Sequence, residues 1–182
     1  MTIWLGANDA ALAPSVQHVP LETYRSNLLE MIDLIRAATP HTRLLLLTPP
    51  PLSPDKWRSQ NLDKPVDGGQ ECGRTVQVTE TYAQAVRDVA GARSVTLVDI
   101  WETMTARAEL DGDLDSFLLD GLHLTQKGYD VVSDGKCTAP LHLCLSRLGV
   151  PARTEGLYEM CRRGSACDSH HLARVVLGRD AP

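Results

Sequence analysis

Short apolar runs alternate with helically spaced apolar positions through the first two-thirds of the sequence. Residues 2–5, 43–48 and 95–100 are rich in apolar side chains and have the length of strands. The four consecutive leucines at 44–47 are typical of a strand that is covered on both faces. The three runs therefore predict three strands.

Two longer segments between these runs carry apolar residues at the spacing of a helix. In each segment the apolar positions recur three or four residues apart, so they share one helical face. They are Tyr24, Leu28, Met31, Ile32 and Ile35 in the first segment, and Val78, Tyr82, Ala85, Val86 and Val89 in the second. Pro20 suits the first turn of a helix, and Pro40 stops it. The two patterns predict amphipathic helices.

The alternation of strands and helices predicts a layered α/β domain with a parallel sheet. Residues 52–73 are polar and rich in Pro and Gly, which predicts a long surface loop. Residues 101–119 predict one or two short helices. Because ligand sites in such sheets lie at the carboxyl ends of strands, residues 8 and 120–123 are placed where a site is expected.

The composition changes near residue 135. Residues 1–135 carry 11 Lys and Arg against 19 Asp and Glu, a net charge of −8, whereas residues 136–182 carry 7 against 4, a net charge of +3. Four of the five Cys and three of the six His also lie in the second segment. We therefore expect one domain over residues 1–134 and an atypical Arg/Cys/His-rich tail over residues 135–182 that is not part of the fold.

The bulk composition is that of an ordinary globular protein. With 182 residues, 43% of them hydrophobic, and a net charge of −5, the chain can form one domain with a sizeable core. A mildly acidic chain gives no sign of a nucleic-acid surface, and no apolar run approaches the roughly 18 residues of a membrane span. Residues 1–6 have no basic leader and no cleavable pattern, so we expect no signal peptide.

The stretch Asp120-Gly121-Leu122-His123 sets a carboxylate and an imidazole three residues apart. One interpretation is that Asp120 fixes the tautomer and orientation of His123, whose other ring nitrogen then takes a proton from a nucleophile. The alternative is a loop Asp that caps a helix starting near Thr125, beside an incidental His. Gly121 permits a tight turn, and the motif directly follows an apolar run, so both features favour the first interpretation.

A second candidate follows the first predicted strand, in Gly6-Ala7-Asn8-Asp9. Asn and Asp in a turn usually serve the turn itself. The side-chain amide of Asn8 can also donate a hydrogen bond to a developing oxyanion, and one such donor is typically worth ~3 kcal/mol. Asn8 is therefore a candidate oxyanion-hole residue.

Taken in order, these motifs resemble conserved blocks of the SGNH (GDSL-type) hydrolases, most closely those of the isoamyl acetate-hydrolysing esterase subgroup. Residues 3–10, IWLGANDA, are similar to the third block, and residues 120–129, DGLHLTQKGY, to the fifth. Residues 17–21, 47–51 and 74–83 fit as well, so the likeness covers roughly residues 1–134. It implies a flavodoxin-like three-layer α/β/α sandwich, hydrolysis of short-chain carboxylic esters, a small-molecule ester as substrate, and no cofactor or metal. It also implies a cytoplasmic location.

The resemblance also implies a role for each candidate residue. Asn8 would be the oxyanion-hole Asn, Asp120 the orienting acid and His123 the general base. The family's nucleophilic Ser lies in a Gly-Asp-Ser turn upstream of the strand that is first in this chain, so we expect the first strand and helix of the fold, the nucleophile, and hence activity, to be missing from this form. Ser116 and Ser169 each follow an Asp, but neither follows an apolar strand, so we expect neither to substitute.

Two other functions stay open on the sequence. One is a non-catalytic protein that keeps the fold for binding. The other is a zinc-binding module in the tail, where Cys161, Cys167, His170 and His171 are potential ligands, although their spacing fits no standard zinc finger.

Overall fold

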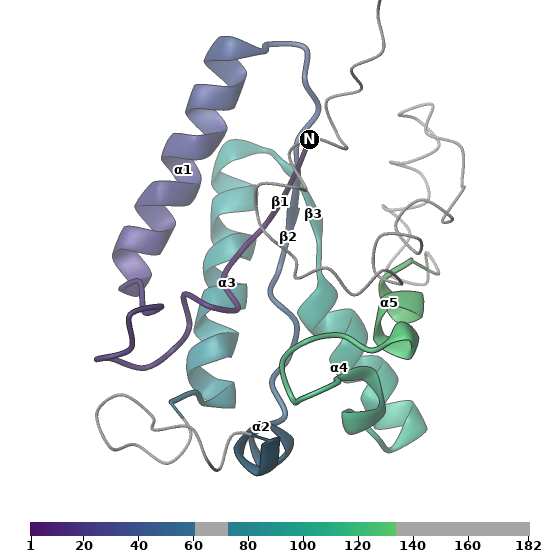
Figure 1. Cartoon of the computed structure of the whole chain (residues 1–182). Helices are drawn as coiled ribbons and strands as arrows, with labels where there is room; N and C mark the ends of the chain where they lie inside the picture. Colours follow the sequence, from purple (N-terminus) through teal and green to yellow (C-terminus); the bar gives the residue numbers. More distant parts are fainter. Residues whose placement is uncertain (61–72, 134–182) are drawn as a thin grey trace, which may run out of the picture.

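The computed structural model describes residues 1–60 and 73–133 of the chain. Within them, three strands form a parallel sheet in the order β1-β2-β3, namely β1 (Thr2–Trp4), β2 (Leu45–Leu47) and β3 (Thr96–Val98). The described helices are α1 (Leu21–Ala38), α2 (Pro54–Gln60), α3 (Val76–Arg93), α4 (Ile100–Asp111) and α5 (Gln126–Ser133), with a short 3-10 helix, η1, at Asp115–Phe117. The predicted alternation of strands and helices is confirmed (Figure 1).

Helices cover the sheet on both faces (Figure 1). Successive side chains of a strand point to opposite faces. Leu46 accordingly belongs to the core cluster that includes α1 and α3, whereas Leu45 belongs to the cluster that includes α4 and η1. Right-handed crossovers that proceed in one direction along the sheet place α1 and α3 on the same face. The three-layer α/β/α arrangement expected from the sequence is confirmed in the described residues.

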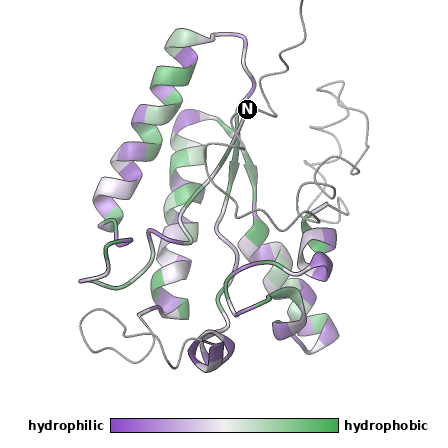
Figure 2. Ribbon diagram, viewed as in Figure 1, coloured by the Kyte–Doolittle hydropathy of each residue, from purple (hydrophilic) through white to green (hydrophobic). Residues whose placement is uncertain are grey.

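Apolar and polar residues alternate along the two long helices (Figure 2), and the buried residues fall on the faces that the apolar spacing predicts. The fully buried side chains among those positions are Tyr24, Leu28 and Ile32 in α1 and Tyr82, Ala85, Val86 and Val89 in α3. The rings of Tyr24 and Tyr82 join the two helices, with their centroids 5.1 Å apart. Thr75 caps α3, because its hydroxyl oxygen accepts the N–H of Val78 at 3.1 Å.

Strands β2 and β3 are shorter than the apolar runs suggest because the residues at their carboxyl ends make other bonds. A carboxylate oxygen of Asp99 accepts the N–H of Glu102 at 3.1 Å, so Asp99 caps α4. The hydroxyl oxygen of Thr48 accepts the N–H of Trp101 at 2.9 Å. Ile100 therefore begins α4 instead of ending β3.

The predicted surface loop over residues 52–73 contains a helix, α2, so the prediction is wrong at that point. Pro54 occupies the first helical position, where a missing N–H costs nothing. The N–H of Trp57 then donates to the carbonyl of Ser53 at 2.9 Å. The Pro and the polar residues that suggested a loop are therefore the start of a short helix. Residues 61–72 lie outside the described residues.

Helix α5 meets η1 at a glycine. The hydroxyl oxygen of Thr125 accepts the N–H of Gly128 at 3.1 Å, which caps α5 and fixes its start. A Cβ added to Gly128 would collide with the carbonyl oxygen of Phe117. Phe117 is fully buried, so its backbone has no room to move away. The close approach requires a glycine.

Replacing Gly128 with Ala should therefore destabilise the chain, typically by ~1–3 kcal/mol, because the added methyl group overpacks a buried contact. The matched control is Gly91→Ala in α3, where an added Cβ meets nothing within 4 Å. That change should stabilise the chain by about 0.5–1 kcal/mol, since Ala loses less backbone entropy in a helix than Gly. Denaturant unfolding of the two variants measures both effects. Equal stability of the Gly128 variant and the parent chain would contradict the proposed contact.

Candidate active site

The candidate Asp and His lie on a tight hairpin after α4. Leu118 and Leu124 form an antiparallel bridge at its base, and the N–H of Leu119 donates to the carbonyl of His123 at 2.6 Å. Leu118 is fully buried in the core beside α4, which anchors the hairpin. Residues 119–123 are thereby presented as a short, closed loop.

Asp120 holds the hairpin and the imidazole together. One of its carboxylate oxygens, Oδ1, accepts the backbone N–H groups of Leu122 at 3.0 Å and His123 at 2.9 Å. The other, Oδ2, lies 2.7 Å from Nδ1 of His123. Because a carboxylate only accepts hydrogen bonds, Nδ1 carries the proton in this pair and Nε2 of the neutral ring is left as an acceptor. The structure thus brings Asp120 and His123 into the contact that an orienting acid and a general base need.

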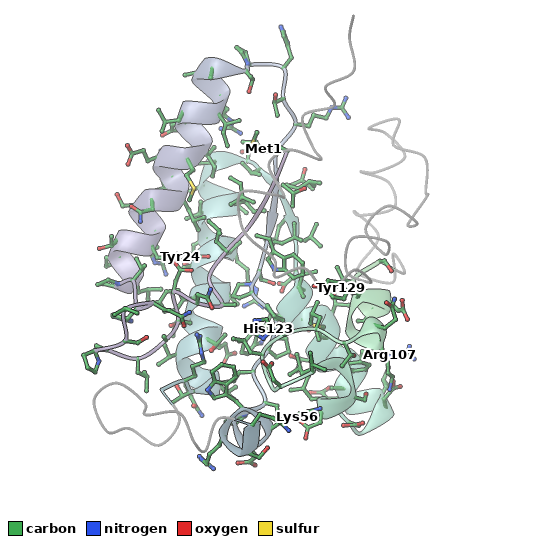
Figure 3. The ribbon with its side chains drawn as sticks, viewed as in Figure 1. Met1, Tyr24, Lys56, Arg107, His123 and Tyr129 are labelled. Carbon is green, nitrogen blue, oxygen red and sulfur yellow. The ribbon has the colours of Figure 1, made fainter. Side chains whose placement is uncertain are left out.

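The pair is electrostatically asymmetric. Partial burial acts to raise the pKa of Asp120, but the hydrogen bonds from the His123 N–H, the His123 ring and the Leu122 N–H outweigh it and hold that pKa below its usual range. The side chain of Asp120 is 28% exposed, whereas that of His123 is 67% exposed. The carboxylate is therefore kept ionised beside an imidazole that is exposed to solvent (His123 is labelled in Figure 3).

Gly121 fixes the hairpin against the chain that follows β2. Its φ is +92°, a conformation that side chains with a Cβ rarely adopt. A Cβ at this position would lie 2.5 Å from both the Ser53 carbonyl oxygen and the Trp57 nitrogen. The N–H of Ser53 donates to the Gly121 carbonyl at 2.9 Å. Gly121 thus forms the tight turn that the sequence predicts. It also allows a close approach to α2 that the sequence did not indicate.

Asn8 lies in the turn that follows β1. Gly6 opens this turn with a φ of +112°, and Asp9 closes it by accepting the N–H of Gly6 at 3.0 Å. The carbonyl of Asn8 accepts the N–H of Ala11 at 3.0 Å. Its side chain is exposed, and in the part of the chain that the structure describes the amide makes no hydrogen bond. The amide of Asn8 is therefore available as a donor, while Asp9 serves the turn.

A buried arginine connects the Asn8 turn to the segment under the hairpin. Arg74 is only 4% exposed, and its guanidinium donates to the Ala7 carbonyl and, at 2.7 Å, to the Gln17 side chain. It also lies over the Trp57 ring, 5.2 Å from the centroid. Trp57 in turn abuts Gly121. Asn8 and His123 are joined by no hydrogen bond of their own, but this chain of contacts places their loops at the same edge of the sheet.

Of the two candidate serines, only Ser116 lies in the described residues, and its hydroxyl makes no hydrogen bond to the imidazole. The hydroxyl of Ser116 donates to the Asp113 carbonyl at 3.2 Å and accepts a hydrogen bond from Lys127 at 2.8 Å. Ser169 lies outside the described residues, as do the potential zinc ligands and the whole of the predicted tail. None of the hydrogen bonds that His123 makes to described residues involves a serine.

Residues 1–60 and 73–133 contain neither a cluster of metal ligands nor a membrane-spanning helix. No three His, Cys, Asp or Glu side chains in this part of the chain gather closely enough to hold a metal ion. Its helices include none with the length and apolarity to span a membrane.

The fold and the site together define an α/β protein with an Asp–His pair at the carboxyl edge of a parallel sheet. Residues 1–131 match the GDSL-like Lipase/Acylhydrolase family, and the chain belongs to that family. The resemblance seen in the sequence motifs is thereby confirmed.

Curated relatives and solved structures agree with this assignment. The chain is 39% identical over 136 residues to the isoamyl acetate-hydrolyzing esterase 1 homolog of Bos taurus, covering 72% of this chain and 51% of that protein. It is 34% identical over 139 residues to a GDSL esterase/lipase of Arabidopsis thaliana, covering 73% of this chain and 55% of that protein. A lipase/acylhydrolase from Enterococcus faecalis superposes with a TM-score of 0.53 at 26% identity, over 74% of this chain and 60% of that one. The chain spans about half the length of the curated relatives that it matches.

The lowered pKa of Asp120 predicts how stability depends on pH. The ionised carboxylate stabilises the folded chain above the unfolded-state pKa, and this contribution is lost as the pH falls through the lower, folded-state pKa. We expect Asp120→Asn to be less stable than the parent at neutral pH, and the difference to shrink as the pH falls below the ordinary aspartate range. Denaturant unfolding over a pH series measures it. The control is Asp115→Asn, an exposed neighbour; a pH-independent difference for Asp120→Asn would contradict the prediction.

Proposed function

We propose that the chain carries the acid–base pair and an oxyanion donor of a carboxylic-ester hydrolase. His123 acts as the general base, Asp120 orients it, and Asn8 donates to the oxyanion. The observation that carries the proposal is the 2.7 Å contact between Nδ1 of His123 and Asp120, which leaves Nε2 as a proton acceptor on an exposed ring.

The proposed reaction proceeds through an acyl-enzyme. A serine hydroxyl attacks the ester carbonyl carbon while Nε2 of His123 accepts the serine proton, and the resulting oxyanion accepts a hydrogen bond from Asn8. The bond from carbon to the alcohol oxygen then breaks, and the alcohol leaves with the proton from His123. Water repeats the sequence on the acyl-serine and releases the carboxylic acid. His123 must be neutral before the attack by serine and again before the attack by water. Neither step uses a metal ion.

The nucleophile is the part that this sequence does not supply. It contains no Gly-Asp-Ser, and Ser116 is bonded to Asp113 and Lys127 instead of to His123. We infer that a separate segment carrying Gly-Asp-Ser must supply the serine, and that the chain alone does not hydrolyse esters. The names of the curated relatives support an acetate ester of a small alcohol as the first substrate to test. The likeness of the chain to this family also supports the cytoplasmic location that we expect.

A two-part assay tests the proposal. The chain alone should show no His123-dependent hydrolysis of p-nitrophenyl acetate or isoamyl acetate. A fusion that supplies the Gly-Asp-Ser block should hydrolyse both, because it completes the nucleophile, base and acid. In that fusion Asp120→Asn should lower kcat roughly ten-thousandfold by favouring the wrong tautomer. Asn8→Ala should lower it roughly a hundred- to a thousandfold, since it removes one donor among several.

His41→Ala is the matched control, because this imidazole is exposed and lies far from the hairpin in the sequence. It should leave turnover unchanged while His123→Ala abolishes it. Turnover by the chain alone that is lost in His123→Ala would show that a serine within the chain is the nucleophile. An active fusion in which Asp120→Asn is silent would overturn the roles given to the pair. A folded fusion without esterase activity would instead favour a binding protein that keeps the fold.

A further inference from the structure

A lysine on α2 contacts the base of the Asp–His hairpin. The ammonium group of Lys56 donates to the carbonyl of Leu118 at 2.7 Å and to that of Asp115 at 2.8 Å. Leu118 is the residue that pairs with Leu124 to close the hairpin. Lys56 therefore reaches across from a different element and bonds the backbone at the point where the hairpin begins (Figure 3).

The carbonyl of Leu118 is costly to leave unpaired, whereas the bond to Asp115 is exposed and the Asp115 carbonyl also accepts the N–H of Leu118 at 3.3 Å. Leu118 is fully buried, and its bond to Lys56 lies in a partly buried environment. A buried acceptor that loses its partner suffers the full cost of its desolvation. The compact ammonium of lysine has three donors, which lets one side chain bond both carbonyls at once.

The same segment also touches the far end of the hairpin. The N–H of Ser53, just before α2, donates to the carbonyl of Gly121. The backbone of Trp57 leaves no space for a side chain at Gly121. The hairpin is thus held to α2 at its base by Lys56 and at its turn by Ser53 and Trp57.

We propose that Lys56 is a positioning residue for the Asp120–His123 pair. It fixes the base of the hairpin on α2 and so sets where the imidazole stands relative to the edge of the sheet. The consequence for catalysis rests on the proposed function, whereas the ordering of the hairpin does not. Lys56 touches neither member of the pair, so its influence passes through the backbone of residues 115–118.

The test is nuclear magnetic resonance of the full chain with Lys56→Met, which keeps the apolar stem and removes the donors. We expect amide exchange of Leu122 and His123 to accelerate about tenfold or more, as the loss of hydrogen bonds from a charged group implies. The downfield Nδ1 proton signal of His123 should broaden or disappear. Lys56→Arg, which keeps the charge and the donors, should restore both readouts.

Arg58→Met is the matched control, because Arg58 is a cation on the same helix that pairs only with exposed Asp55 among the described residues. It should change neither readout. Unaltered exchange and an unaltered ring signal in Lys56→Met would overturn the proposal, as would equal effects of Arg58→Met. Because neither readout needs turnover, an absence of esterase activity would leave this result standing, and an unaltered ring signal would leave the proposed function untouched.

A measurement on the parent chain applies even if Lys56→Met does not fold. Acetylation of Lys56, followed by mass spectrometry, should be about tenfold or more slower in the folded chain than in urea, because both carbonyls hold the ammonium in the folded state. Equal rates in the two states would overturn the proposal.

Discussion

The close approach of Gly121 to the start of α2 is the constraint on which the candidate site depends. It joins the hairpin that follows α4 to the chain that leaves β2, although these segments are more than 60 residues apart in the sequence. Only a residue without a Cβ, and with a positive φ, allows the two backbones to meet in this way. Without the contact, the turn of the hairpin would lose its direct attachment to the segment that follows β2.

Polar groups at this edge of the sheet are bonded in networks that link one strand end to the next. Arg74 connects the turn after β1 to Trp57 in α2. Thr48, directly after β2, donates to Asp99, directly after β3, at 3.2 Å. Arg87 donates to Asp99 at 2.7 Å, and burial, which acts to raise the pKa of that carboxyl, is outweighed by this and other hydrogen bonds, so the pKa is lowered. A buried charge is tolerated only when it is paired in this manner. Apolar packing stabilises the core, whereas hydrogen bonds stabilise the carboxyl edge of the sheet.

The sequence predicted the elements whose signals are local. Helical spacing identified α1 and α3, and the three apolar runs identified the strands, because each pattern repeats within one element. The Asp120–His123 contact was predictable for the same reason, since three residues and one glycine suffice to close it. Helix α2 was missed because its proline and polar residues describe a helix start as well as they describe a loop. The contacts of Lys56 left no pattern at all, because they join a side chain to backbone carbonyls about sixty residues away.

Local contacts therefore orient the imidazole, and distant contacts fix its place in the molecule. Residues 118–124 contain the contacts that orient the imidazole directly, namely one bridge and three hydrogen bonds to Asp120. The place of that imidazole in the molecule is set by α2 and by the turn that carries Asn8, which are far away in the sequence. Reactivity is a different matter, because a general base acts only when a nucleophile is held within hydrogen-bond reach of its free nitrogen.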